Sequence, residues 1–160
     1  MGYTLEAVIA GDALLGAAAR ELPGATVVPL AQGLALLPMT EGRYPGGSAA
    51  EPADGLGFWS LPAGFAAVLA RWSAAGPVAY GEADYFGGTG EQRAAVWAAG
   101  ALVWGPSHTP EGRPSSPAGS PLSQALRRLG ATAGGAVDEF AAVGLDRHRS
   151  TERWARAGGG

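Results

Sequence analysis

Apolar and polar residues alternate over a short stretch at the start of the chain. This alternation across residues 3–9 predicts a strand. Gly11 and Asp12, which follow it, can cap a short helix over residues 13–21. The chain is therefore expected to begin with a strand and a helix.

Two apolar runs, at residues 26–31 and 34–39, follow this helix and flank Gln32-Gly33. That pair can adopt the positive φ angles of a tight hairpin, so the runs predict two antiparallel strands. Residues 41–57 are rich in Gly, Pro, Ser and Ala, a composition typical of a mobile surface loop.

Helical spacing of apolar residues returns after this loop. Ser60 can cap a helix that begins near Leu61-Pro62. The residues expected on one apolar face of that helix are Phe65, Val68, Leu69 and Trp72. Gly76-Pro77 then predicts the end of the helix.

The central segment predicts three consecutive strands. Residues 78–86, 91–97 and 101–104 combine aromatic and branched residues, and Gly87 to Gly90 provides the first turn. This pattern is typical of an antiparallel meander.

The C-terminal third predicts helices after a linker. Residues 106–120 have the composition of a mobile loop, and Ser120-Pro121 predicts the start of a helix over residues 122–129. Two shorter helices are expected over residues 137–143 and 150–156.

The order of predicted elements is β-α-β-β-α-β-β-β-α-α-α. Such an order favours the α+β class, in which helices pack on one face of a mostly antiparallel sheet of about six strands. A chain of 160 residues with 47% hydrophobic residues can bury roughly two-thirds of its unfolded surface. We therefore predict a single domain over residues 1–157, with a frayed tail at 158–160.

Composition narrows the class of partner. The net charge is −3, and the 11 basic residues are scattered until the last turns of the chain, so no overall positive field recruits nucleic acid. The absence of cysteine is typical of a reducing cytoplasm and excludes thiolate metal ligands. Because no apolar run approaches the length of a spanning helix, we predict neither export nor membrane insertion. The exclusive use of Arg for basic residues favours a bacterial source.

Two acidic residues in the predicted strand 78–86 could carry chemistry. If residues 87–90 form a four-residue loop, Glu82 and Asp84 share a sheet face about 7 Å apart, with Arg93 opposite Asp84. The pair could hold a metal or act as acid and base, with Arg93 orienting an anionic substrate. An ordinary solvated ion pair is the preferred interpretation, because further metal ligands are not supplied nearby.

The glycine-rich turn permits a second interpretation. GGTG could cradle a phosphate if residues 91–99 formed a helix whose N-terminus faced the anion. The order of glycines does not match a dinucleotide fingerprint, and the residues after the turn favour a strand. We therefore predict no cofactor, no metal and no catalytic residue.

Several segments of the chain carry a family resemblance: GEADYFGGTGEQ, AVW, QALRRLG and VDEFAAVGLDRHRSTERW. Together they resemble a group of small bacterial α+β proteins with an E-x-[DE]-[YF]-F-G-G-x-G-x-Q segment, similar in size to immunity proteins that neutralise a toxin. The resemblance implies that the motif positions are Glu82, Asp84, Phe86, Gly87, Gly88, Gly90 and Gln92. It implies no reaction for any of them.

These observations favour a non-enzymatic cytoplasmic protein that binds another protein, most specifically as an inhibitor or immunity protein. Trp59, at the end of an element, is expected to add an aromatic contact beside the motif residues and Arg93. Two alternatives remain open at this point. One is a small enzyme or anionic-ligand domain that uses Glu82, Asp84 and the GGTG turn, and the other is an accessory subunit of a larger assembly.

Overall fold

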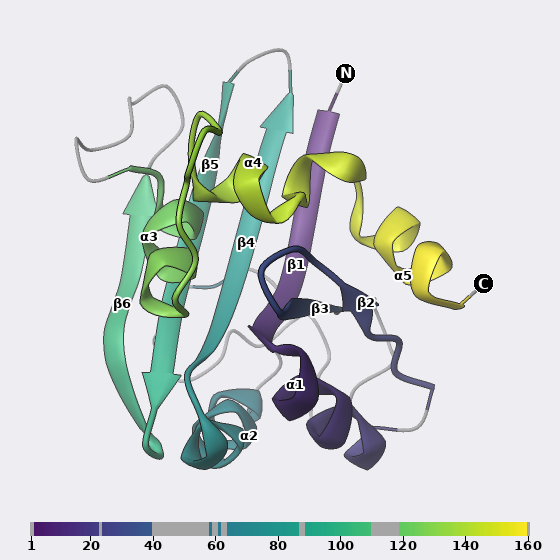
Figure 1. The fold of residues 1–160 in the computed structure, drawn as a ribbon, viewed down its shortest axis with the longest axis vertical. Helices are drawn as coiled ribbons and strands as arrows, with labels where there is room; N and C mark the ends of the chain where they lie inside the picture. Colours follow the sequence, from purple (N-terminus) through teal and green to yellow (C-terminus); the bar gives the residue numbers. More distant parts are fainter. Residues whose placement is uncertain are drawn as a thin grey trace.

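A six-stranded sheet in the order β2-β3-β1-β4-β5-β6 forms the centre of the fold (Figure 1). This is seen in a computed structural model that describes residues 2–22, 24–39, 58, 61, 64–86, 89–109 and 119–159. All neighbouring strands are antiparallel. The strands are β1 (Gly2–Gly11), β2 (Val28–Pro29), β3 (Leu34–Pro38), β4 (Val78–Phe86), β5 (Thr89–Ala98) and β6 (Ala101–Thr109).

Five α-helices and three short 3-10 turns surround this sheet in the described part of the chain. The helices are α1 (Asp12–Ala18), α2 (Phe65–Trp72), α3 (Pro121–Arg128), α4 (Glu139–Val143) and α5 (Thr151–Gly159). The 3-10 turns are η1 (Ala19–Glu21), η2 (Ser73–Ala75) and η3 (Leu145–Arg147). The predicted α+β class, the mostly antiparallel sheet of six strands and the order of elements are confirmed.

The predicted packing of all helices on one face is wrong. One buried cluster lies between the sheet and α1 and α2, and it contains Val8 and Tyr80. A second cluster lies between the opposite face and α3, α4 and α5, and it contains Ile9, Ala79 and Trp154. Because neighbouring residues of a strand point to opposite faces, apolar residues at consecutive positions of β1 and β4 give the sheet two faces to cover.

The first predicted hairpin is present with its turn as expected, but its first strand spans only Val28–Pro29 instead of residues 26–31. Gln32 and Gly33 both have positive φ angles, 63° and 75°, between β2 and β3. Ala99 and Gly100 form a similar two-residue turn between β5 and β6, with φ angles of 52° and 85°. Turns of this hand suit the twist of antiparallel strands.

Helix α2 begins later than expected. It begins at Phe65, after Gly64 in the left-handed conformation, whereas the predicted cap Ser60 and the loop at 41–57 lie outside the described residues. The apolar face predicted for this helix is confirmed, because Phe65, Leu69 and Trp72 are buried in the first cluster.

Strand β6 is longer than the predicted 101–104. It continues through residues 105–109 with a cis peptide bond between Gly105 and Pro106, so the expected linker at 106–120 does not begin at 106. The residues after Thr109 and before Gly119 lie outside the described part. Ser120 accepts a hydrogen bond from Ser123 N and caps α3, as predicted.

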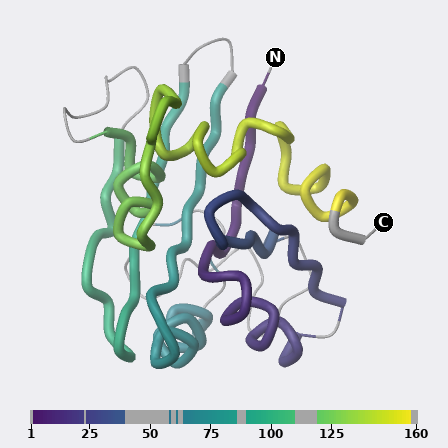
Figure 2. The backbone as a smooth tube through the Cα atoms, viewed as in Figure 1, coloured from purple at the N-terminus to yellow at the C-terminus, as the bar shows by residue number. Residues whose placement is uncertain are grey.

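The C-terminal segment crosses the second face of the sheet and ends beside β2 (Figure 2). It also covers the part of β1 that β3 does not reach: Thr4 N donates to Arg149 O at 2.9 Å, and Glu6 N donates to Thr151 Oγ1 at 3.1 Å. Trp154 of α5 is fully buried. None of the described helices is both long and apolar enough to cross a membrane.

Candidate functional site

Ionisable side chains gather at one end of the sheet face that carries α1 and α2. Cross-strand partners share a face, so the register aligns Glu6 of β1 with Glu82 of β4, Glu82 with Arg93 of β5, and Arg93 with His108 of β6. Asp84 and Glu91 form the next row on the same face. We call this group the acidic patch, comprising Glu6, Glu82, Asp84, Glu91, Arg93 and His108.

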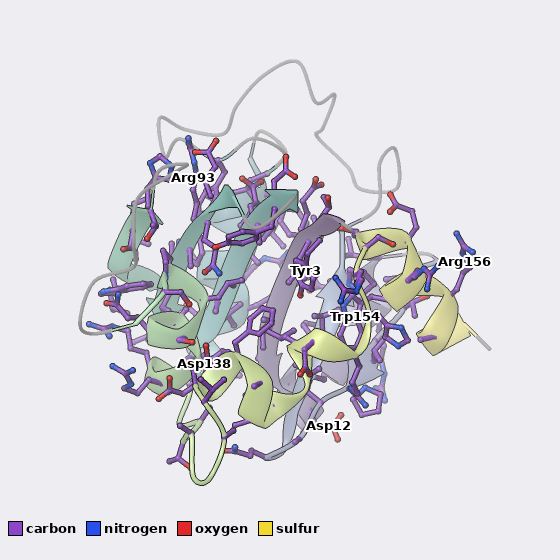
Figure 3. All side chains as sticks on the ribbon, turned by 90° about the horizontal axis from the view of Figure 1, so that it is seen from above. Tyr3, Asp12, Arg93, Asp138, Trp154 and Arg156 are labelled. Atoms are coloured by element: carbon purple, nitrogen blue, oxygen red, sulfur yellow. The ribbon has the colours of Figure 1, made fainter. Side chains whose placement is uncertain are left out.

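The acidic patch lies on the side of the sheet away from α3, α4 and α5. In Figure 3, which views the molecule from above, Arg93 lies on one side of the sheet and Asp138 and Trp154 lie on the other. The helices of the C-terminal third therefore do not cover it.

Glu82 is the buried member of the patch. Its side chain is fully buried, and Tyr80 on the same strand donates a hydrogen bond to Glu82 Oε2 at 2.7 Å. Burial raises the pKa of Tyr80, and the neighbouring charge of Glu82 raises it further. Tyr80 therefore keeps its proton and acts as a donor to the Glu82 carboxylate.

The predicted pairing of Asp84 with Arg93 is wrong. Phe86 pairs with Thr89, so the strands separate over two residues instead of four, and Arg93 faces Glu82. A shift of two positions changes each partner but leaves every side chain on its predicted face, since the side-chain period of a strand is two. The prediction that Glu82 and Asp84 share a face is therefore correct.

Asp84 and Glu91 form the next row of the patch, where Asp84 is exposed and Glu91 is half-buried. They are direct cross-strand partners, which sets two carboxylates opposite each other. Glu91 Oε2 lies 2.7 Å from His108 Nε2 and 3.9 Å from Arg93 Nη2. Asp84 itself is exposed, so one carboxylate of the pair faces solvent while the other contacts His108 and Arg93.

Gln92 belongs to the other face. It is buried, and its Oε1 accepts a hydrogen bond from Leu122 N, in the first turn of α3, at 3.0 Å. An acceptor at this position satisfies an amide that the helix itself leaves without a partner. Gln92 therefore positions α3 and is not part of the acidic patch.

Gly90 allows β4 and β5 to approach closely. A Cβ atom at this position would lie against Asp84 O and only 2.6 Å from Tyr85 Cα. Only glycine fits there without a shift of the backbone. Of the other motif positions, Gly87, Gly88 and the side chain of Phe86 lie outside the described residues. Trp59, the predicted aromatic contact, lies outside them as well.

The phosphate-cradle interpretation lacks the helix that it requires. Residues 91–98 belong to β5, so no helix N-terminus follows the GGTG turn. Within the described ranges, no three His, Asp or Glu side chains are grouped in a way that could hold a metal ion.

A histidine bonded to a carboxylate can also act in acid–base catalysis. His108, however, lies on the outermost strand of the sheet, and 36% of its side chain is exposed. Glu82 is buried while Asp84 is exposed, so these two carboxylates do not face a common substrate position. The arrangement suits a contact surface better than an enclosed reaction site.

Three members of the acidic patch were missed in the sequence. Glu6 and Glu91 were assigned only to strands, and His108 was placed in the linker. One signal could have identified Glu6: it is a lone charge in the alternating pattern of the first strand, at a position that shares a face with Val8.

No family model, curated protein or solved structure matches this chain. The resemblance to a group of small bacterial proteins remains a prediction from the motif residues. Function is therefore inferred from the acidic patch itself.

Proposed function

We propose that this protein is a non-enzymatic binding module that docks a basic surface of another protein on its acidic patch. One observation carries the proposal. Among the described residues, the polar end of this sheet face holds three carboxylates that are at least partly exposed, Glu6, Asp84 and Glu91, beside the buried Glu82 and against the single guanidinium of Arg93.

Electrostatics supports a cationic partner. Like charges at directly opposite positions of two strands destabilise the pair by about 0.2–1 kcal/mol. A lysine or arginine side chain from a partner would relieve this repulsion between Asp84 and Glu91. The net charge of −3 would also steer a basic partner toward the protein.

An inhibitory role is the narrower form of this proposal. An acidic surface can occlude the basic cleft of a toxin or an enzyme, and the motif resemblance points to immunity proteins. This narrower form predicts that the bound partner loses activity in the complex.

The test is capture of a partner by tagged protein, in which wild type is compared with the double variant Asp84→Asn/Glu91→Gln. Asp146→Asn/Glu152→Gln is the matched control, because it removes the same charge from two exposed acids of the C-terminal segment. We expect a partner that is retained by wild type and by the control, lost by the patch variant, and released by salt. Equal recovery by the two double variants would contradict the proposal.

A further inference from the structure

The sheet ends in two unlike edges. Edge strand β2 has two residues, and Pro29 lacks a backbone donor while its carbonyl accepts a hydrogen bond from Arg147 Nη2 at 2.8 Å. Edge strand β6 has nine residues, and no strand of the described chain pairs with its outer side. Within the described chain, β6 is therefore the longer edge without a strand partner, and Pro106 is the one residue of this strand that lacks a backbone donor.

The β6 edge exposes apolar side chains at its first residues. Leu102 is 41% exposed and Val103 is 58% exposed; Val137 is the third large apolar side chain in the described ranges that is exposed. Residues 101–107 contain no ionisable side chain. Edge strands of monomeric proteins usually carry charged residues that prevent association, and this end of β6 lacks them.

The apolar end of β6 is held rigidly in place. Ala99 N donates to Ser73 O, and Gly100 N donates to Ser73 Oγ, each at 3.0 Å. Ser73 is buried at the end of α2, so the β5–β6 turn is anchored to the core. A surface that is already ordered loses little conformational entropy when it binds.

We propose that this edge binds a second copy of the chain, with the two β6 strands antiparallel about a two-fold axis near Leu102 and Val103. A two-fold contact sets the same strand against itself, which would place like charges near each other if the strand were charged. Residues 101–107 carry no charge of their own, and the guanidinium of Arg128 that lies 4.6 Å from the centre of the Trp104 ring belongs to α3.

The position of the acidic patch supports the same arrangement. His108 lies at the far end of β6 from Leu102, so the two patches of a dimer would lie on opposite sides of the axis, roughly 35 Å apart along the strands. That separation is several times the Debye length of about 8 Å at physiological salt, so repulsion between two acidic patches would be screened.

The contact is expected to be centred on the apolar end of β6. Two register shifts against β5, between Leu102 and Trp104 and between Trp104 and Ser107, make the strand irregular. Because bulges bend an edge strand, we do not expect regular pairing along its whole length. Leu102 and Val103 would supply the packed centre of the interface.

The test is sedimentation equilibrium over a wide range of protein concentration. The apparent mass of wild type is expected to rise with concentration from the 16.0 kDa of the chain to twice that value. Leu102→Lys/Val103→Lys should remain at the monomer mass, whereas Val137→Lys, which charges the most exposed of the three apolar residues, should still dimerise. Circular dichroism should show that each variant is folded.

A cross-linking experiment tests the position of the axis. Because the chain has no cysteine, Val103→Cys introduces a single thiol, and oxidation should trap a covalent dimer. Val137→Cys should not be trapped. The proposal would be overturned if wild type stays monomeric at all concentrations, even if it then captures a different protein through β6. A dimer that survives the double lysine substitution would overturn it as well.

The proposal is independent of the acidic patch. Loss of the dimer in the β6 variant leaves the four carboxylates in place, so patch binding and dimerisation can fail separately. If both hold, the dimer presents two acidic patches, which would raise the apparent affinity for a partner with repeated basic surfaces.

Discussion

The two faces of the sheet are built from the same strands but bury different kinds of side chain. The face beneath α3, α4 and α5 carries an apolar cluster that includes the fully buried Trp154. The face beneath α1 and α2 is apolar at one end, around Tyr80, and ionisable at the other. Glu82 is buried as completely as Trp154.

This difference shows that burial alone does not mark a core. A buried indole contributes transfer free energy and packing, whereas a buried carboxylate costs free energy unless hydrogen bonds and opposite charges compensate it. Tyr80 supplies such a hydrogen bond to Glu82, and Arg93 is the cross-strand partner of Glu82 in the register. Glu82 is therefore a compensated polar group within the fold, and it adds little to stability by itself.

The largest effect is expected on the apolar face. Trp154→Ala should lower the free energy of unfolding by about 3–5 kcal/mol, because it leaves a large cavity between α5 and the sheet. Urea denaturation measures this change, with Arg153→Ala on the exposed side of the same helix as control. A loss below about 1 kcal/mol, the typical value for a point mutation, would show that α5 adds little to the fold.

A smaller effect is expected for the buried carboxylate. Tyr80→Phe removes the donor to Glu82 and should cost roughly 1.5–3 kcal/mol, the range for hydrogen bonds to charged groups. Tyr3→Phe on the other face removes a bond to the neutral carbonyl of Leu145 and should cost only about 0.5–1.5 kcal/mol. Equal losses in urea denaturation would mean that Glu82 is not charged.

Gln92 tests the link between β5 and the helix that covers it. Gln92→Ala leaves Leu122 N without its acceptor and should cost about 0.5–2 kcal/mol, as for the loss of a helix cap. Hydrogen exchange should become faster for the amides of α3 and remain unchanged for those of α5. Unchanged exchange in α3 would show that Gln92 does not position this helix.

A pH-dependent contribution is expected from Glu139, the first residue of α4, which forms an ion pair with Arg127 of α3. The hydrogen bond from Arg127 lowers the pKa of Glu139 below its ordinary value of 4.5. Because the folded pKa is the lower one, the pair stabilises the fold above the unfolded value, and this contribution is lost as pH falls through the folded pKa. Urea titrations of wild type and Glu139→Gln should therefore differ near neutral pH and converge in acid.

The smallest effect on stability is expected for Asp84. Its cross-strand partner is Glu91, so Asp84→Asn removes a like-charge contact and should stabilise the fold by about 0.2–0.5 kcal/mol. Thermal unfolding at low and high salt measures this gain, which salt should reduce. A loss of several kcal/mol would show that Asp84 belongs to a buried network.

Local features of the chain were predictable because they depend on short-range geometry. The order of strands and helices follows from hydrophobic periodicity, and the Gln32-Gly33 hairpin follows from residues that tolerate positive φ angles. The shared face of Glu82 and Asp84 follows from the two-residue period of a strand. None of these features requires knowledge of a distant partner.

The membership of the acidic patch depended on the tertiary structure. The glycine-rich turn is compatible with a loop of either two or four residues, so strand pairing alone decided that Arg93 faces Glu82. Glu6 joins Glu82 only because β1 lies between β3 and β4, and Gln92 leaves the site because α3 docks on its face. The sequence by itself determined which elements form and which way each strand residue points. The long-range pairing of strands and the docking of helices decided which of those residues meet, because each such contact joins segments far apart in the chain.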